Sequence, residues 1–133
     1  MIARATPRVQ AAGLADRCQL IAGSFFETIP AGADAYLMRH IIHDWTDDQC
    51  LTILRHIHRV LPADGRLLVI ESVIPPANDP FFGKLLDLTM LTIPGGRERT
   101  REEFAHLFHS AGFRLTRIVP TATEASVLEG RKA

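Results

Sequence analysis

The segment Asp34-Ala-Tyr-Leu-Met38, followed directly by Arg39-His-Ile-Ile-His-Asp-Trp45, decides the fold class of this chain. Residues 34–38 are a short apolar run typical of a β-strand, whereas the apolar residues after Thr46 recur at helical spacing. Thr46 and Gln49 have the spacing of a capping box, which predicts a helix over Asp47–Leu61. His43 is therefore expected at the carboxyl end of a strand, where open α/β sheets bind their ligands.

The rest of the chain alternates between strand and helix patterns, which predicts an α/β layered sheet. Arg66–Ile74 is nearly continuous Leu, Val and Ile, as expected of a central strand buried on both faces. The other expected elements are a weak helix at 8–13, a strand at Cys18–Ala22, a helix at 82–92, a helix opened by the capping box of Thr100 and Glu103 and stopped by Gly112, and a closing antiparallel hairpin of Phe113–Val119 with Ala125–Glu129. No strand is followed by a Gly-x-Gly turn and a helix, the usual opening of a nucleotide-binding sheet.

Composition narrows the class of partner. The 133 residues suffice for one domain, and 47% of them are hydrophobic. Fifteen basic and fifteen acidic residues cancel, so the sequence gives no reason to expect nucleic acid or an anionic membrane as partner and favours a small molecule. Cys18 and Cys50 form no disulfide framework, which indicates a cytoplasmic protein, and both are expected to be buried as small hydrophobic side chains. The basic start of the chain leaves two alternatives open, an organellar transit peptide or part of a longer helix.

Three residues make a coherent proton-transfer site. His43 has the side chain best matched to accepting a proton near neutral pH. Glu71 lies near the end of the next strand, so parallel pairing places it on the same rim, and a carboxylate in an apolar strand needs a partner. Glu98 follows Gly95-Gly96 and either reaches the same site or remains a solvated charge between two arginines. A carboxylate bonded to one imidazole nitrogen fixes the tautomer and stabilises the imidazolium.

Two rival chemistries are weaker. His40 and His43 are three residues apart and His56 and His58 two apart, and neither pair belongs to a recognisable metal-ligand spacing, so no metal is expected. Ser24 lacks the sequence context of an activated nucleophile.

Four motifs together resemble the S-adenosylmethionine-dependent O-methyltransferases of the plant caffeate type and their bacterial small-molecule relatives. The motifs are Ala22-Gly-Ser-Phe-Phe-Glu27, His43-Asp-Trp45, Ile70-Glu-Ser-Val73 and Gly95-Gly-Arg-Glu-Arg-Thr100. The resemblance implies methyl transfer from S-adenosylmethionine to a hydroxyl of a small, aromatic acceptor. It also implies that His43 is the general base and that Glu71 and Glu98 orient it.

Further roles follow from the same resemblance. Gly23, Ser24 and Phe25 match the positions near the adenine, with serine where the family usually has an acid. Arg39 matches a basic position that meets the cofactor, and Asp44 and Met90 fall where the family contacts its substrate.

The resemblance covers only the C-terminal part of a typical member. It implies a partial Rossmann-like sheet, in which the family strand order 3-2-1-4-5-7-6 lacks its first two strands. It also implies that the N-terminal dimerisation domain and the glycine-rich cofactor motif are absent, in a family whose full-length members are homodimers. The strand at Asp34–Met38 is then expected to have an exposed edge, which invites pairing with another chain. Two hypotheses remain: the catalytic region of a longer enzyme, inactive when isolated, or a non-catalytic remnant that acts as an interaction module through that edge.

Overall fold

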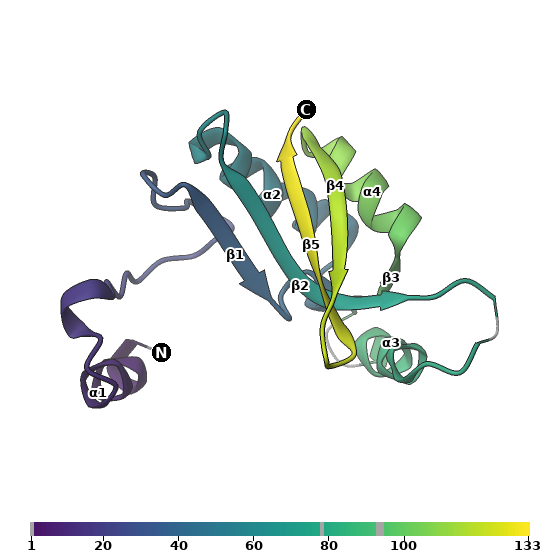
Figure 1. Ribbon diagram of the computed structural model, residues 1–133, viewed down its shortest axis with the longest axis horizontal. Helices are drawn as coiled ribbons and strands as arrows, with labels where there is room; N and C mark the ends of the chain where they lie inside the picture. Colours follow the sequence, from purple (N-terminus) through teal and green to yellow (C-terminus); the bar gives the residue numbers. More distant parts are fainter. Residues whose placement is uncertain (1, 78, 93–94) are drawn as a thin grey trace.

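A mixed five-stranded sheet covered on one face by two helices forms the body of the molecule (Figure 1). The computed structural model describes residues 2–77, 79–92 and 95–133. The elements, in chain order, are α1 (Ile2–Ala11), the 3₁₀ turn η1 (Ala15–Arg17), β1 (Ala35–Arg39), the 3₁₀ turn η2 (Ile42–Asp44), α2 (Asp47–Val60), β2 (Arg66–Ile74), α3 (Phe82–Thr92), β3 (Arg99–Thr100), α4 (Arg101–Ser110), β4 (Phe113–Pro120) and β5 (Ala125–Lys132).

The sheet has the order β1-β2-β5-β4, and the short β3 pairs with the far end of β2. β1 and β2 are parallel, as expected, and β4 and β5 form the predicted antiparallel hairpin beside β2. In the parallel register Arg39 pairs with Ile70, so Glu71 lies one residue beyond the end of β1. The chain that leaves β1 towards His43 therefore passes directly over Glu71.

The two capping boxes predicted from the sequence are confirmed. Thr46 with Gln49 opens α2, and Thr100 with Glu103 opens α4. α2 and α4 contact each other on the same face of the sheet (Figure 1). Each fully buried aliphatic side chain there stabilises the fold by about 1.5–3 kcal/mol. The buried positions of the two helices are Cys50, Ile53, Leu54, Ile57, Phe104, Leu107 and Phe108.

The strand predicted at Cys18–Ala22 is wrong, because this segment runs as irregular chain. A strand needs hydrogen bonds from a neighbouring strand, and among the described residues nothing pairs with this segment. In the same part of the molecule β1 pairs on one side only, with β2, and the Leu37 side chain is 60% exposed. The free edge predicted for the strand that is now β1 is confirmed within the described part of the chain.

The amino-terminal helix is also longer than the sequence predicts. α1 begins at Ile2 and continues through Pro7, although the 8–13 pattern suggested a start after this proline. Proline lacks one N–H donor, and the Thr6 hydroxyl donates to the Ile2 carbonyl one turn earlier. α1 buries none of its side chains and lies apart from the sheet (Figure 1). Within the described ranges, no helix is long and apolar enough to cross a bilayer.

Candidate active site

Glu71 anchors the turn that carries the candidate base. Its Oε1 atom accepts the backbone N–H groups of Ile41 at 3.0 Å and Ile42 at 2.9 Å. The carboxylate is fully buried within β2, one residue beyond the last pair that β2 makes with β1. These two bonds fix the path of η2, so they fix where His43 leaves the backbone.

Glu98 makes the direct contact with His43. Its Oε1 atom lies 2.7 Å from His43 Nδ1, and both side chains are almost completely buried. The interpretation of Glu98 as a solvated surface charge is therefore wrong. Gly96 allows this approach, because a Cβ atom there would collide with the His43 backbone carbonyl. The Glu98 N–H donates to Asp87 Oδ1 at 2.7 Å, which ties the loop to α3.

The two imidazole nitrogens of His43 have different contacts, because Nδ1 is hydrogen-bonded to Glu98 and Nε2 has only a longer contact, with Asp44. The short contact of Nδ1 with a carboxylate assigns the ring proton to Nδ1, which leaves a lone pair on Nε2. Asp44 Oδ1 lies 3.5 Å from Nε2, and its side chain is partly exposed. The arrangement leaves Nε2 beside the partly exposed carboxylate of Asp44.

The charges around His43 shift the ionisation of the cluster. The hydrogen bond with Glu98 raises the pKa of His43, and the charge of Glu71 adds to this while burial opposes it. Burial raises the pKa of Glu71, although His43 and the two backbone N–H groups favour its charged form. Burial also lowers the pKa of the neighbouring His40. His43 therefore binds a proton more tightly in this site than an ordinary histidine does in water.

Arg99 is the residue of the site that sequence reasoning missed. It is fully buried and donates to the backbone carbonyls of Ile42 at 3.1 Å and Trp45 at 3.2 Å, and to Asp47 Oδ1 at 2.7 Å. These bonds hold the carbonyl groups of the turn, whereas Glu71 holds its N–H groups. Its position inside a charged run gave no sign of burial, but an arginine immediately before a capping threonine is placed where a helix start meets the sheet.

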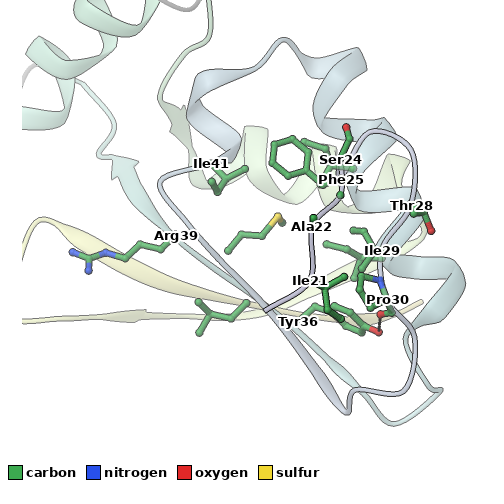
Figure 2. Close-up of a pocket in the computed structure, with 15 residues that line it drawn as sticks. Ile21, Ala22, Ser24, Phe25, Thr28, Ile29, Pro30, Tyr36, Arg39 and Ile41 are labelled. Atoms are coloured by element: carbon green, nitrogen blue, oxygen red, sulfur yellow. Dashed lines mark hydrogen bonds between the residues drawn. The ribbon is translucent and has the colours of Figure 1, made fainter. Parts of the chain in front are cut away.

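The predicted cofactor residues come together around a separate pocket beside β1. Gly23, Ser24, Phe25 and Arg39 all line this cavity, which has a volume of about 480 Å³ (Figure 2). Most of the lining is apolar, from the 21–30 segment, β1 and α2. Ser24 Oγ already accepts the Phe26 N–H at 3.3 Å. The Arg39 guanidinium points away from Ser24 and Phe25 in Figure 2.

Aromatic contacts join this pocket to the segment that carries the base. Phe26 packs edge-on against Phe25 and against Trp45, each with ring centroids 4.8 Å apart. Such pairs stabilise by about 0.5–1.5 kcal/mol beyond the area they bury. The two candidate subsites are thus parts of one packed unit.

The two predicted substrate residues differ in their placement. Asp44 lies beside the base, as described above. Met90 lies half-buried on α3, the helix that holds the Glu98 loop through Asp87, and it does not line the pocket beside β1.

Comparison with known proteins shows the family to which this chain belongs. A family model described as an O-methyltransferase domain matches residues 1–114. The chain belongs to the O-methyltransferase family. It is 46% identical over 124 residues to the phenazine O-methyltransferase PhzM of Lysobacter antibioticus, covering 93% of this chain and 36% of that protein.

The structure is also similar to solved structures of O-methyltransferases. The crystal structure of the O-methyltransferase NcsB1 from neocarzinostatin biosynthesis, in complex with S-adenosylmethionine and 2-hydroxy-5-methyl naphthoic acid, superposes with a TM-score of 0.88 at 35% identity, covering 97% of this chain and 38% of that one. The chain is also similar to a protein named for another reaction, aclacinomycin 10-hydroxylase RdmB of Streptomyces purpurascens, at 46% identity over 84% of this chain and 30% of that protein. This chain spans about a third of the length of such relatives.

Proposed function

We propose that the chain supplies the acid–base part of an enzyme that transfers a methyl group from S-adenosylmethionine to a hydroxyl of a small, aromatic acceptor. The observation that carries the proposal is the buried imidazole of His43, whose Nδ1 atom is held 2.7 Å from Glu98. In the neutral ring this contact favours the tautomer with its proton on Nδ1 and a lone pair on Nε2. Relatives named for methyl transfer to small aromatic compounds support the reaction class.

In the proposed mechanism His43 Nε2 takes the proton of the acceptor hydroxyl. An ordinary phenol with a pKa near 10 and an ordinary histidine near 6.5 differ by about 3.5 units, which corresponds to roughly 5 kcal/mol. The pKa of His43 is raised by Glu98 and Glu71, so this gap is narrower in the site. Glu98 bonds to the imidazolium that forms, and Glu71 Oε2, 3.6 Å from Nδ1, adds a second negative charge.

S-adenosylmethionine supplies the electrophilic methyl group when it is bound. Gly23, Ser24, Phe25 and Arg39 are the residues of this chain that we assign to it. The pocket fits a flat, apolar ring such as adenine, because Phe25 and aliphatic side chains line it. No carboxylate among the described residues lines that pocket, so the ribose hydroxyls and the cationic sulfonium lack partners there. This chain therefore provides only the adenine end of a cofactor site.

Asp44 and Met90 are the residues we assign to the acceptor. Asp44 lies 3.5 Å from the proposed proton-accepting nitrogen and is partly exposed, so an acceptor hydroxyl that reaches Nε2 meets its carboxylate. Met90 comes from the helix that also holds Glu98 in place through Asp87. A flexible thioether on such a helix suits contact with an aromatic ring.

We place residues 1–133 as the C-terminal portion of a Rossmann-like catalytic domain. The observed order β1-β2-β5-β4 agrees with the second half of the sheet expected from the resemblance. The first two strands, the glycine-rich cofactor motif and an N-terminal dimerisation domain then belong to a longer, cytoplasmic, homodimeric enzyme. In that longer enzyme, the first strand of the complete sheet pairs with the free edge of β1. The isolated chain is then inactive.

A second candidate function rests on the same free edge. A non-catalytic remnant would present β1, with Leu37 60% exposed, to a strand of another protein. In that case the His43 cluster serves stability alone.

The test is a chimera in which residues 1–133 replace the matching third of the phenazine O-methyltransferase of Lysobacter antibioticus. Methylated product should form, and His43→Ala should reduce kcat by about 10²–10⁴-fold, the usual contribution of a general base. His109→Ala is the matched control, because His109 is exposed at the end of α4. Product formation unaffected by His43→Ala excludes His43 as the base, and a hydroxylated product excludes methyl transfer.

A further inference from the structure

The sheet has a second face, opposite to the face that α2 and α4 cover (Figure 1). Leu67 and Val69 of β2 are buried in the core beneath these helices. Side chains alternate along a strand, so Arg66 points to the second face, and it is exposed there. α3 approaches this face at Ser72, against which Gly83 packs. The half of the face around the start of β2 is therefore left to solvent.

The strand register collects four arginines around one glutamate on this second face. Arg114 of β4 lies directly opposite Arg131 of β5, and Arg117 of β4 lies opposite Glu129 of β5. The charge of Arg66, from β2, also acts on the Glu129 carboxylate. We call these five residues the arginine cluster. Four guanidinium groups and one carboxylate give it a net charge of +3, although the whole chain is neutral.

A β-bulge makes this arrangement possible. Residues three apart on a regular strand point to opposite faces, but the register shifts between Leu115 and Arg117, which leaves Thr116 as an extra residue. Arg114 and Arg117 therefore point to the same face. The Thr116 hydroxyl donates to the Glu129 backbone carbonyl at 3.0 Å, which holds the bulge in place. Sequence spacing alone would have placed the two arginines on opposite faces.

Glu129 neutralises only part of the arginine cluster. Its Oε2 atom accepts from Arg117 Nε at 3.0 Å and lies 2.8 Å from Arg117 Nη2, while Oε1 lies 3.5 Å from Arg131 Nε. Burial would raise the pKa of Glu129, but the hydrogen bond and charge of Arg117 and the charge of Arg66 lower it. In the part of the chain that the structure describes, Arg66 and Arg114 have no ion-pair partner. Like charges directly opposite each other are destabilising, so the pair of Arg114 and Arg131 costs stability unless an anion lies beside it.

We propose that the arginine cluster binds an acidic segment of a partner protein. Guanidinium groups bind carboxylates through two parallel N–H bonds, which gives such a contact both strength and direction. Further along the same face the surface becomes apolar, because Val127 of β5 lies between Ile70 of β2 and Val119 of β4. Val119 is 41% exposed. Apolar surface beside charged groups, with arginine prominent among them, is the usual composition of a protein–protein interface.

A protein segment fits this face better than a nucleic acid does. Neighbouring strands lie about 4.8 Å apart, so the cluster spans only roughly 10 Å from β2 to β4. Nucleic-acid binding depends on neutralising many phosphates along a longer basic surface, and the apolar patch beside the cluster gives a phosphate backbone nothing to bind. Arg66 begins β2 whereas Glu71 lies in its second half, so the cluster is at the end of the sheet away from His43. The proposal is therefore independent of the proposed function.

The test is binding of a fluorescein-labelled peptide of six glutamates to the 133-residue chain, followed by fluorescence anisotropy at low salt. We expect the parent chain to bind, and the double variant Arg66→Gln, Arg114→Gln to bind about 10-fold more weakly, as the loss of two exposed ion pairs implies. This variant leaves both contacts of Glu129 in place. Because it removes repulsion between like charges, its melting temperature should be no lower than that of the parent.

The double variant Arg4→Gln, Arg8→Gln is the matched control. It removes the same charge from α1, which buries none of its side chains, so it should bind as the parent does. No binding by the parent, equal weakening in the control, or a lower melting temperature of the cluster variant overturns the proposal. Tighter binding of a thymidine hexanucleotide than of the peptide overturns the choice of partner. A parent dimer that the cluster variant abolishes, measured by sedimentation, also overturns it in favour of a second copy of the chain.

Discussion

His43 and Glu98 are 55 residues apart in the sequence, yet His43 Nδ1 lies 2.7 Å from Glu98 Oε1. The contact depends on Gly96, which packs against the His43 carbonyl, and on Asp87, which holds the Glu98 N–H. A loop and a helix that follow the base in the chain thus determine which of its nitrogens carries the proton.

Glu98→Gln should reduce kcat in the chimera by about 10²–10⁴-fold, because loss of the charge weakens both the tautomer preference and the stabilisation of the imidazolium. KM should change much less. Steady-state kinetics checks this, with Glu102→Gln as control, since Glu102 is exposed in the first turn of α4. Equal losses in the two variants would contradict a specific role of Glu98.

Glu71→Ala should lower the free energy of unfolding by about 2–4 kcal/mol, because it leaves the N–H groups of Ile41 and Ile42 without an acceptor. Glu71→Gln should cost less, since its carbonyl oxygen replaces Oε1. Urea unfolding of the isolated chain measures both values. Similar losses for the two substitutions would show that the backbone bonds are not the main contribution.

Arg99→Lys should destabilise the chain by about 2 kcal/mol, although it keeps the charge. A single ammonium cannot replace the fork that reaches Ile42, Trp45 and Asp47 at once. Thermal unfolding checks this against Arg101→Lys, at an exposed position two residues later. Equal melting temperatures of the two variants would contradict the clamp.

Asp47 should make stability depend on pH in the acid range. Partial burial would raise its pKa, but hydrogen bonds from Arg99 and Arg97 outweigh this and lower the pKa from 3.8. The stabilisation is therefore complete above the unfolded value and is lost as pH falls through the lower, folded value. Asp47→Asn should be less stable than the parent at pH 7, and the difference should close below about pH 4. Asp48→Asn, in the same helical turn, is the matched control, and an equal loss of stability at pH 7 in the two variants would contradict the role of Asp47.

The isolated chain should bind S-adenosylmethionine weakly or not at all, because only the adenine end of a site is present. Calorimetric titration checks this directly. Low-micromolar affinity would contradict the assignment, whereas restored affinity in the chimera would support it. Phe25→Ala in the chimera should weaken binding, since stacking on an aromatic ring is worth about 1–3 kcal/mol per base.

The sequence predicted the parts of the fold that local patterns specify. Both capping boxes, the bounds of β2 and the C-terminal hairpin depend on residues close together in the chain, and the structure has them. The strand at Cys18–Ala22 failed because its formation depends on a neighbouring strand rather than on its own apolar residues. Cys18, expected to be buried with Cys50, is exposed in the same segment.

The candidate site divides in the same way. The sequence by itself determined that His43 follows one strand and that Glu71 lies inside the next, because strand ends and helix starts are encoded by residues close together in the chain. Only the tertiary structure decided that Glu98 is buried against His43 and that Arg99 clamps the turn. It also decided that His40 lies near a Glu71 oxygen that has no hydrogen-bond partner in the described part of the chain. These contacts join residues tens of positions apart, and the pairing of β1 with β2 and the packing of the Glu98 loop bring them together.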